Sequence, residues 1–383
     1  MTNEVLRGLI DMLEPAYIDV WVEACNFESP SRDKMRVDKL GEYFIKKADS
    51  LGFKVDIYGQ KVAGDVISIT MNPEASGAPI VFSGHIDTVF AIGDFGTPAT
   101  RLLGDKIYGP GVVDCKGGVV SALYAMDVLQ RAGYTRRKIM LILQTDEETN
   151  SSLSHGETID HISNISKEAI AFLNLEGHTR GEMCLVRKGI LTAEFTVMGK
   201  AAHASKCATQ GASAILEAAN KIISLEAFKD AGGITACVGV IEGGRATNTV
   251  PDECRFKCNF RFSSAKELAR IKDAVSELVN KPSVPGCTCA VEYTELRPAM
   301  EENEKSLALF NKINNIFEKN GLPVLKIGRR TGGSDAANIS AAGIPCIDSI
   351  GTTGDFIHTT GEFAYVASLR EAAERLVFIA REL

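Results

Sequence analysis

A histidine and an aspartate close an apolar run in the segment APIVFSGHIDTVFA. Residues 80–82 are typical of a buried strand, and His85 and Asp87 follow directly. On an extended backbone, side chains two positions apart point to the same side, and burying them costs free energy unless they are paired. The pair is therefore either a metal ligand with the carboxylate that orients it, or a strand end that leaves the core with a capping aspartate.

Further acidic and histidine residues follow other apolar runs. If these runs are strands of one sheet, groups at their carboxyl ends meet at one edge. Each residue also has an ordinary interpretation: acids suit a helix start, aspartate is a frequent N-cap, and a lone histidine is often structural. The residues are Asp146, Glu147 and Glu148 after KIMLILQT, Glu176 after AIAFLN, His358 after IPCIDSIG, and Asp114 in the glycine-rich turn GPGVVDCKGG.

A cluster of this composition requires cations. Asp114, Glu148 and Glu176 carry three negative charges, which repel one another if they are unpaired. Two Zn²⁺ ions carry enough positive charge to balance them and leave room for one hydroxide, which bridges metals about 3.5–4 Å apart in a hydrolytic two-metal site. Mixed histidine and carboxylate ligands suit Zn²⁺, with Co²⁺ or Mn²⁺ as alternatives, and exclude a dedicated Ca²⁺ cage.

The elements that would position these residues alternate along the chain. Apolar spacing predicts helices at 4–25 and 32–51, followed by strands at 54–59 and 65–71. Short apolar runs and helices then alternate as far as Gly177, and the same alternation resumes after Pro298. This alternation is typical of an α/β fold in which a mostly parallel central sheet is flanked by helices.

A different pattern begins near residue 184. The strand-like ILTAEFTVMG is followed by a helix at 211–227, two further strands, a helix at 264–280 and the strand CTCAVEYTEL. This βαββαβ order is that of a ferredoxin-like domain. We therefore predict a catalytic domain formed by 1–184 and 297–383, interrupted by an inserted α+β domain at 185–296.

The overall composition excludes some classes of partner. A net charge of −7 over 383 residues argues against nucleic acid or an anionic membrane surface, since either requires a basic face. No window approaches the roughly 18 apolar residues of a membrane span, and the acid-interrupted N-terminus does not resemble a signal peptide. Ten scattered cysteines then favour reduced thiols and a cytoplasmic location.

Seven motifs, in order, resemble those of one enzyme family. SGHIDTV, GPGVVDCKGG, TDEE, LEG, GKAAHAS, GGSDAAN and IHTTGE are similar to motifs of the M20 zinc metallopeptidases, over most of the chain. Within that family the chain looks most like the glutamate carboxypeptidase branch, which is similar to succinyl-diaminopimelate desuccinylase and acetylornithine deacetylase. The resemblance implies a zinc-peptidase-type catalytic domain and a homodimer formed through a dimerisation domain at 185–296.

The resemblance also implies how the two zinc ions are held. His85 and Glu176 would bind one zinc, and Asp87 would fix the tautomer of His85 from behind. Glu148 and His358 would bind the second zinc. Two zinc ions per subunit would then act together as the cofactor of a hydrolase.

Two further roles follow from the same resemblance. Asp114 would bridge both ions and form a cis peptide bond with Cys115, and Glu147 would be the general base that takes the proton of the metal-bridging water. One departure from the family concerns the loop behind Glu147. After the DEE run the family usually has glycine and serine, whereas this chain has Thr149, Asn150 and Ser151, which changes the loop geometry and the shape of the pocket.

Other predicted site residues lie in the inserted domain and in a later turn. His203 resembles the histidine that reaches a neighbouring subunit's site and polarises the scissile carbonyl; alternatively it is a structural loop residue. Asn248 and Arg261 match substrate-holding positions, where a guanidinium can grip a carboxylate, but Arg261 also suits a surface strand. Gly333 and Ser334 offer N–H groups for a substrate carboxylate, or a plain helix cap.

Three functions are compatible with these residues. The leading one is a two-zinc metallopeptidase that cleaves the amide of a small peptidyl or N-acyl amino acid with a free carboxylate. The second keeps the site but deacylates a biosynthetic intermediate, as acetylornithine deacetylase or succinyl-diaminopimelate desuccinylase does. The third is a non-catalytic, metal-stabilised binding protein, which the complete ligand set and proton shuttle disfavour.

Overall fold

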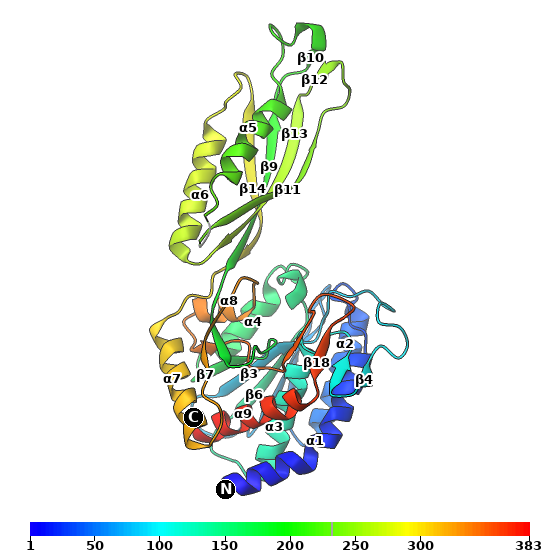
Figure 1. Cartoon of the computed structure of the whole chain (residues 1–383), viewed down its shortest axis with the longest axis vertical. Helices are drawn as coiled ribbons and strands as arrows, with labels where there is room; N and C mark the ends of the chain where they lie inside the picture. Colours follow the sequence, from blue (N-terminus) through cyan, green and yellow to red (C-terminus); the bar gives the residue numbers. More distant parts are fainter. Residues whose placement is uncertain (231–232) are drawn as a thin grey trace. The chain divides into compact units, whose positions relative to one another are not determined.

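Two units, each with its own sheet, divide the chain (Figure 1). The computed structural model describes residues 1–230 and 233–383. The inserted domain is predicted at 185–296, whereas the compact second unit begins and ends slightly later and takes in a short later segment. The first unit contains Met1–Leu185, Glu302–Arg329 and Ser334–Leu383, and the second contains Val186–Glu301 and Arg330–Gly333.

A six-stranded sheet forms the centre of the first unit (Figure 1). Strands β6, β3, β7 and β16 run parallel to one another, while β2 is antiparallel to both β1 and β6. Nearly every side chain of β2, β3 and β6 is buried, so both faces of the sheet are covered. The predicted α/β class with a mostly parallel sheet is confirmed. In spatial order the strands are β1 (Lys54–Tyr58), β2 (Val66–Met71), β6 (Ile139–Gln144), β3 (Ile80–His85), β7 (Ala171–Asn174) and β16 (Cys346–Ile347).

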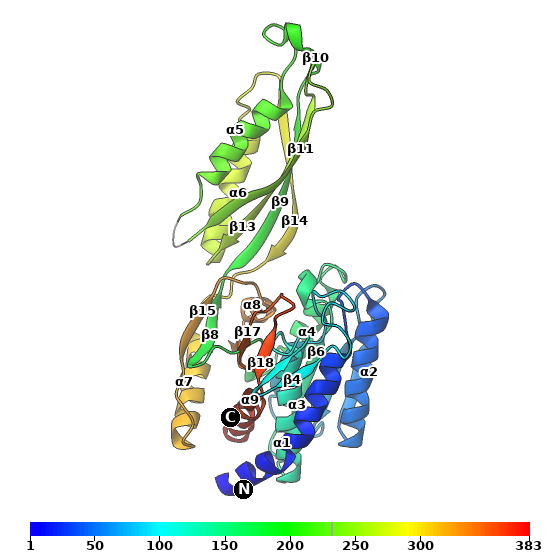
Figure 2. The same cartoon turned by 45° about the vertical axis from the view of Figure 1, so that its right-hand side comes forward.

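Helices flank this sheet, and α3 is enclosed along almost its whole length. It contacts β3 and β6 and also packs against α1 and α9, while α2 packs on β1 and β2 and α4 on β6. Side-chain caps begin several of these helices; for example, Thr2 accepts a hydrogen bond from the N–H of Val5, and Asn303 accepts one from that of Ser306. The helices, seen from a second side in Figure 2, are α1 (Asn3–Asn26), α2 (Lys34–Ser50), α3 (Lys116–Arg131), α4 (Glu157–Ser166), α7 (Glu304–Lys319), α8 (Ala336–Ala341) and α9 (Ala367–Glu382).

A four-stranded sheet of very short strands also belongs to the first unit, and the sequence does not predict it. Its strands are two or three residues long and too short to show an apolar alternation. The pairing of Phe363 with Tyr108 brings the chain around residue 360 beside the chain that leads to Asp114. The strands in order are β17 (Gly354–Asp355), β18 (Phe363–Tyr365), β5 (Lys106–Tyr108) and β4 (Arg101–Leu103), and β8 (Glu182–Arg187) pairs separately with β15 (Lys326–Arg330).

The second unit is an antiparallel sheet with two helices, and its predicted βαββαβ order is confirmed. Buried and more exposed residues alternate along β9 and β13, as expected for a sheet with one covered face. In its core Phe195 stacks on Phe256 with ring centroids 4.6 Å apart. The sheet order is β11-β13-β9-β14. The elements are β9 (Gly189–Met198), β10 (Ala202–His203), α5 (Ala214–Glu226), β11 (Thr235–Gly243), β12 (Thr249–Val250), β13 (Glu253–Phe262), α6 (Ala265–Asn280) and β14 (Thr288–Arg297).

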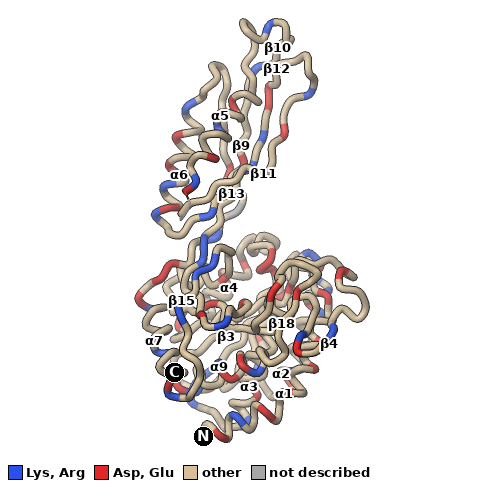
Figure 3. Tube along the Cα trace, viewed as in Figure 1, with Lys and Arg blue, Asp and Glu red and all other residues tan. Residues whose placement is uncertain are grey.

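Charged residues of both signs are interspersed along the outer helix α6 (Figure 3). A polar face of this kind is typical of a helix with one side in water. Across residues 1–230 and 233–383, none of the helices is both long enough and apolar enough to cross a bilayer.

Candidate metal centre

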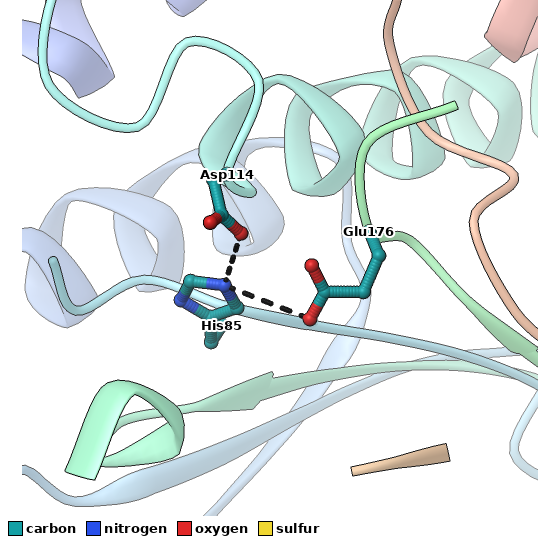
Figure 4. A group of neighbouring side chains, drawn as sticks. All are labelled: His85, Asp114 and Glu176. Atoms are coloured by element: carbon teal, nitrogen blue, oxygen red, sulfur yellow. Dashed lines mark hydrogen bonds and ion pairs between the residues drawn. The ribbon is translucent and has the colours of Figure 1, made fainter. Parts of the chain in front are cut away.

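The first group of candidate ligands meets at the carboxyl edge of the six-stranded sheet (Figure 4). His85 is the last residue of β3, Asp114 precedes α3, and Glu176 follows β7. The Nε2 atom of His85 lies 3.0 Å from Oδ1 of Asp114 and 3.8 Å from Oε1 of Glu176. The side chain of His85 is only 2% exposed, so this group lies beneath the surface.

A second group shares Asp114 with the first. The Nε2 atom of His358 lies 3.2 Å from Oδ2 of Asp114 and 3.1 Å from Oε2 of Glu148. Glu148 belongs to the single-turn 3₁₀-helix η1 (Glu147–Thr149), which follows β6, and His358 lies in the turn between β17 and β18. The side chain of Glu148 is 7% exposed and that of His358 is 54% exposed, so the second group opens to solvent on its His358 side.

Asp114 is the residue that links the two groups. Its Oδ1 atom faces His85 and its Oδ2 atom faces His358, so one carboxylate can serve two ions. The peptide bond between Asp114 and Cys115 is cis, as the family resemblance implies. The N–H of His85 donates to Sγ of Cys115 over 3.0 Å, and this bond ties the Asp114 turn to the end of β3.

Asp87 connects the first group to the turn that carries Glu147 and Glu148. Nδ1 of His85 lies 3.0 Å from the main-chain oxygen of Asp87 and 3.4 Å from its Oδ1. Either acceptor favours a proton on Nδ1, which leaves the lone pair of Nε2 for a metal. The carboxylate of Asp87 also accepts the N–H groups of Glu147 and Glu148 at 3.3 Å each, and the hydroxyl of Ser31 at 2.6 Å.

The charges of the second group shift one another's pKa values. Hydrogen bonds with Asp114 and Glu148 raise the pKa of His358 to about 10. Burial raises the pKa of Glu148 to about 7. Burial also acts to raise the pKa of Asp114, but hydrogen bonds with His358 and His85 outweigh it and hold that pKa well below its usual range. The cluster therefore attracts positive charge, and protons and metal ions compete for the same atoms.

Both groups fit divalent metal ions in their chemistry. Each offers one imidazole and two carboxylates, and the ligand atoms of each group lie within 4.8 Å of one another. Zn²⁺ takes this mixture of nitrogen and oxygen ligands, and Co²⁺ and Mn²⁺ accept the same ligand types. The five predicted ligands are thus brought together as two groups that meet at one shared carboxylate.

Residues 81–382 match the sequence profile of Peptidase family M20/M25/M40. The chain belongs to this family. It is 27% identical over 354 residues to carboxypeptidase G2 of Pseudomonas sp. (strain RS-16). The aligned residues cover 90% of this chain and 84% of that protein. It is also 26% identical to succinyl-diaminopimelate desuccinylase of Corynebacterium glutamicum, over 97% of this chain and 98% of the relative.

Solved structures of other M20 enzymes share the fold of this M20 chain. Aminopeptidase PepT from Bacillus cereus superposes with a TM-score of 0.78 at 22% identity, covering 96% of this chain and 98% of that one. An M20 family metallo-carboxypeptidase from Sulfolobus solfataricus gives 0.73 at 16% identity, over 96% and 98%. Membership of the family, together with the relatives found by sequence, makes this protein a hydrolase that acts on peptide or other amide bonds.

The predicted residues in the second unit of this M20 hydrolase occupy two separate places. His203 and Asn248 are exposed and close together, because β10 pairs with β12. Arg261 lies near the far end of β13, where its Nε donates to Oδ1 of Asn259 over 3.1 Å. The stretch of β13 from Glu253 to Arg261 spans about 26 Å. Within one chain, a small substrate cannot contact both places.

Ser334 and Gly333 take part in hydrogen bonds within the fold. Ser334 is completely buried, and its Oγ accepts hydrogen bonds from Nδ2 of Asn174 at 2.9 Å and from the N–H of Ala336 at 3.2 Å. These bonds fit the plain capping role that the sequence leaves open. The main-chain oxygen of Gly333 accepts a hydrogen bond from Arg187. A substrate role for either residue stays a prediction.

The loop behind Glu147 has an unusual backbone at the place where the sequence departs from the family. Asn150 and Ser151 have φ values of +53° and +54°, in the left-handed region. Asparagine enters this region more readily than most residues. Ser151 is buried, and its Oγ accepts a hydrogen bond from Nε2 of Gln144 over 3.3 Å. The departure therefore has a defined conformation that packs against the end of β6.

Sequence reasoning missed two residues that lie behind the ligands. Ser31 donates to Asp87, and Glu362 accepts N–H groups from the turn that carries Asp114. Glu362 ends the IHTTGE motif and Ser31 lies in the ESPSRD break, so both stood within segments of interest. Their position beside predicted ligands or in a polar break between helices is the only feature of the sequence that points to these two residues.

Proposed function

We propose that the protein is a two-zinc hydrolase that cleaves the amide of a peptidyl or N-acyl amino acid with a free carboxylate, in the manner of a glutamate carboxypeptidase. The observation that carries this proposal is the shared position of Asp114, whose two oxygens face His85 and His358. In the proposal Glu176 completes the ligands of one ion and Glu148 those of the other.

The roles of the remaining residues follow from their positions. Bound zinc ions would polarise the scissile carbonyl and make water a nucleophile at neutral pH. Glu147 is held at the start of η1 by the bond from its N–H to Asp87, and we assign it the transfer of the water's proton to the leaving amine. Glu147 and the ligand Glu148 can differ in role because successive side chains of a 3₁₀-helix point in different directions.

The second unit supports a homodimer through residues 185–296. His203 and Arg261 cannot contact one small substrate within a chain, so a site that uses both takes residues from two chains. The edge strand β11 exposes Val240 and Ile241, and α5 exposes Ile223, which suits pairing with a second copy. In this arrangement His203 and Asn248 of one subunit enter the other subunit's site. There His203 polarises the carbonyl, and Asn248 holds the substrate carboxylate together with Arg261 of the other subunit.

A second candidate function, removal of an acyl group from a diamino acid, has support in the comparisons. The desuccinylase of Corynebacterium glutamicum matches nearly the full length of the chain. An acetylornithine deacetylase of Myxococcus xanthus is 29% identical over 57% of this chain and 60% of its own length. The same ligands would serve either reaction, since both hydrolyse an amide next to a carboxylate.

A metal count and a substrate panel test the proposal together. The panel contains peptides with a C-terminal glutamate, N-acylglutamates, N-acetylornithine and N-succinyl-diaminopimelate. We expect two zinc ions per chain and the highest kcat/KM on the glutamate amides. Preference for N-acetylornithine or N-succinyl-diaminopimelate would select the deacylase. Metal uptake with no hydrolysis of any amide would select the binding protein.

A further inference from the structure

Glu362 is a buried carboxylate that lies behind the candidate metal centre. Its side chain is completely buried. Its Oε1 atom accepts the N–H groups of Val113 and Asp114 at 2.9 and 3.2 Å, and its Oε2 atom accepts that of Gly111 at 3.3 Å. Backbone N–H groups that converge in this way form an anion-binding nest. Here the anion is a side chain of the protein itself.

The turn that supplies these N–H groups has a backbone suited to the purpose. Gly111 has a φ of +78°, a conformation that other residues rarely adopt. A Cβ atom at this position would lie 3.1 Å from the side chain of Lys116. Glycine thus allows the chain to reverse, so that its N–H and those of Val113 and Asp114 converge on one carboxylate.

Glu362 also belongs to the turn that carries His358. Its own N–H donates to the main-chain oxygen of Thr359 over 3.0 Å, and its main-chain oxygen accepts the N–H of Gly109 over 3.4 Å. Strand β18, which follows Glu362 directly, pairs with β5. One residue therefore joins the His358 turn to the Asp114 turn by both its side chain and its main chain.

We propose that Glu362 is a positioning residue that holds Asp114 in register with His358, and so sets how tightly the second ligand group binds its metal ion. The inference rests on the proposed two-metal centre. A carboxylate suits this place because it presents two acceptor oxygens and no donor to three N–H groups. An amide keeps one acceptor oxygen and turns donors toward an N–H group, while alanine removes every acceptor.

Calorimetric titration of Zn²⁺ into chelator-treated protein tests this role. Loss of a residue that supports metal ligands typically lowers metal affinity about 10–100-fold. We expect Glu362→Ala to weaken at least one of the two binding steps by that factor and Glu362→Gln to weaken it less. Excess zinc should restore most of the kcat of both variants, because Glu362 touches no reacting atom.

Glu374→Gln is the matched control. Glu374 is also a buried carboxylate, but it lies on α9 and pairs with Arg7 and Arg370. This variant should bind both zinc ions like the wild type. A similar loss of affinity in Glu374→Gln would reveal a general effect of removing a buried charge and would overturn the proposal.

Circular dichroism shows which variants fold, and if Glu362→Ala does not, Glu362→Gln alone decides. Wild-type affinity for both ions in the folded variants would overturn the positioning role. A wild-type chain that binds fewer than two ions would instead defeat the proposed two-zinc function. The two failures are therefore distinguishable in the same titration.

Discussion

The two units of the molecule place their predicted site residues in opposite ways. In the first unit, five candidate ligands from distant segments form two groups that share Asp114, and the ligand atoms of each group lie within 4.8 Å of one another. In the second, His203 and Asn248 lie together while Arg261 lies near the other end of β13. Buried carboxylates need opposite charges close by, whereas residues proposed to contact substrate on a surface can lie apart within one chain. The first unit thus brings all five of its candidate ligands together, whereas the second unit keeps its predicted residues in two separate places.

Replacement of the proton carrier is expected to have the largest effect on the complete centre. Glu147→Gln removes the proposed base, so kcat should fall by about 10²–10⁴-fold, while metal binding should be unchanged because no proposed ligand changes. Steady-state kinetics and metal analysis measure the two quantities. Glu157→Gln, an exposed acid in the first turn of α4, is the control. A kcat near that of the wild type would remove Glu147 from this role.

Mixed dimers test whether the parts in the second unit serve another chain. His203→Ala should lower kcat by about 10²–10³-fold, as expected for loss of an oxyanion donor. Co-expression with Glu147→Gln should restore roughly a quarter of wild-type activity, because half of the dimers are mixed and one of their two sites is intact. No recovery in isolated mixed dimers would show that His203 does not act across subunits.

Proton release on metal binding is a smaller effect that belongs to the first unit alone. The pKa of about 10 keeps His358 protonated at pH 8 in chelator-treated protein, and a metal ion binds only neutral imidazole. Zinc binding should therefore release the proton of His358 at pH 8, and this part of the release should fade as the pH rises through 10. His85 adds to the release, because, against the effect of burial, interactions with Cys115, Asp114 and Asp87 raise its pKa well above the usual value. Glu148, with a pKa of about 7, adds further release only below that pH.

Calorimetry in two buffers of different ionisation enthalpy measures the released protons. His203→Ala should leave the number unchanged, which would sharpen the contrast between the units. A binding enthalpy at pH 8 that does not depend on the buffer would contradict the raised pKa of His358.

Long, periodic elements could be predicted from the sequence, and very short ones could not. The helix predicted at 32–51 is observed as Lys34–Ser50, since its apolar spacing repeats over several turns. The strand Arg101–Leu103 is three residues long and all three are exposed, so no alternation marks it. Its sheet forms because β18 returns to pair with β5, and a pairing between such distant segments leaves no local pattern.

The ligands of the candidate centre could also be predicted, and so could Asp87 behind His85, but Ser31 and Glu362 could not. His85 and Glu176 follow conspicuous apolar runs, so their position at a sheet edge can be inferred from the sequence. Glu362 lies in the polar stretch TTGEF, which is typical of an exposed turn. Its burial depends on three N–H groups contributed by a segment far away in the chain. The pattern of hydrophobic residues along the sequence therefore does not predict that Glu362 is buried.

The discontinuity of the first unit has a consequence for biosynthesis. Glu176 is the last of four candidate ligands to be translated before the second unit, and only His358 follows it, with Glu362 close behind. Domains tend to fold as they leave the ribosome. The second unit can therefore fold before His358, the last candidate ligand, has been synthesised. Metal binding by the group that contains His358 would then be one of the final events in the maturation of the newly made polypeptide.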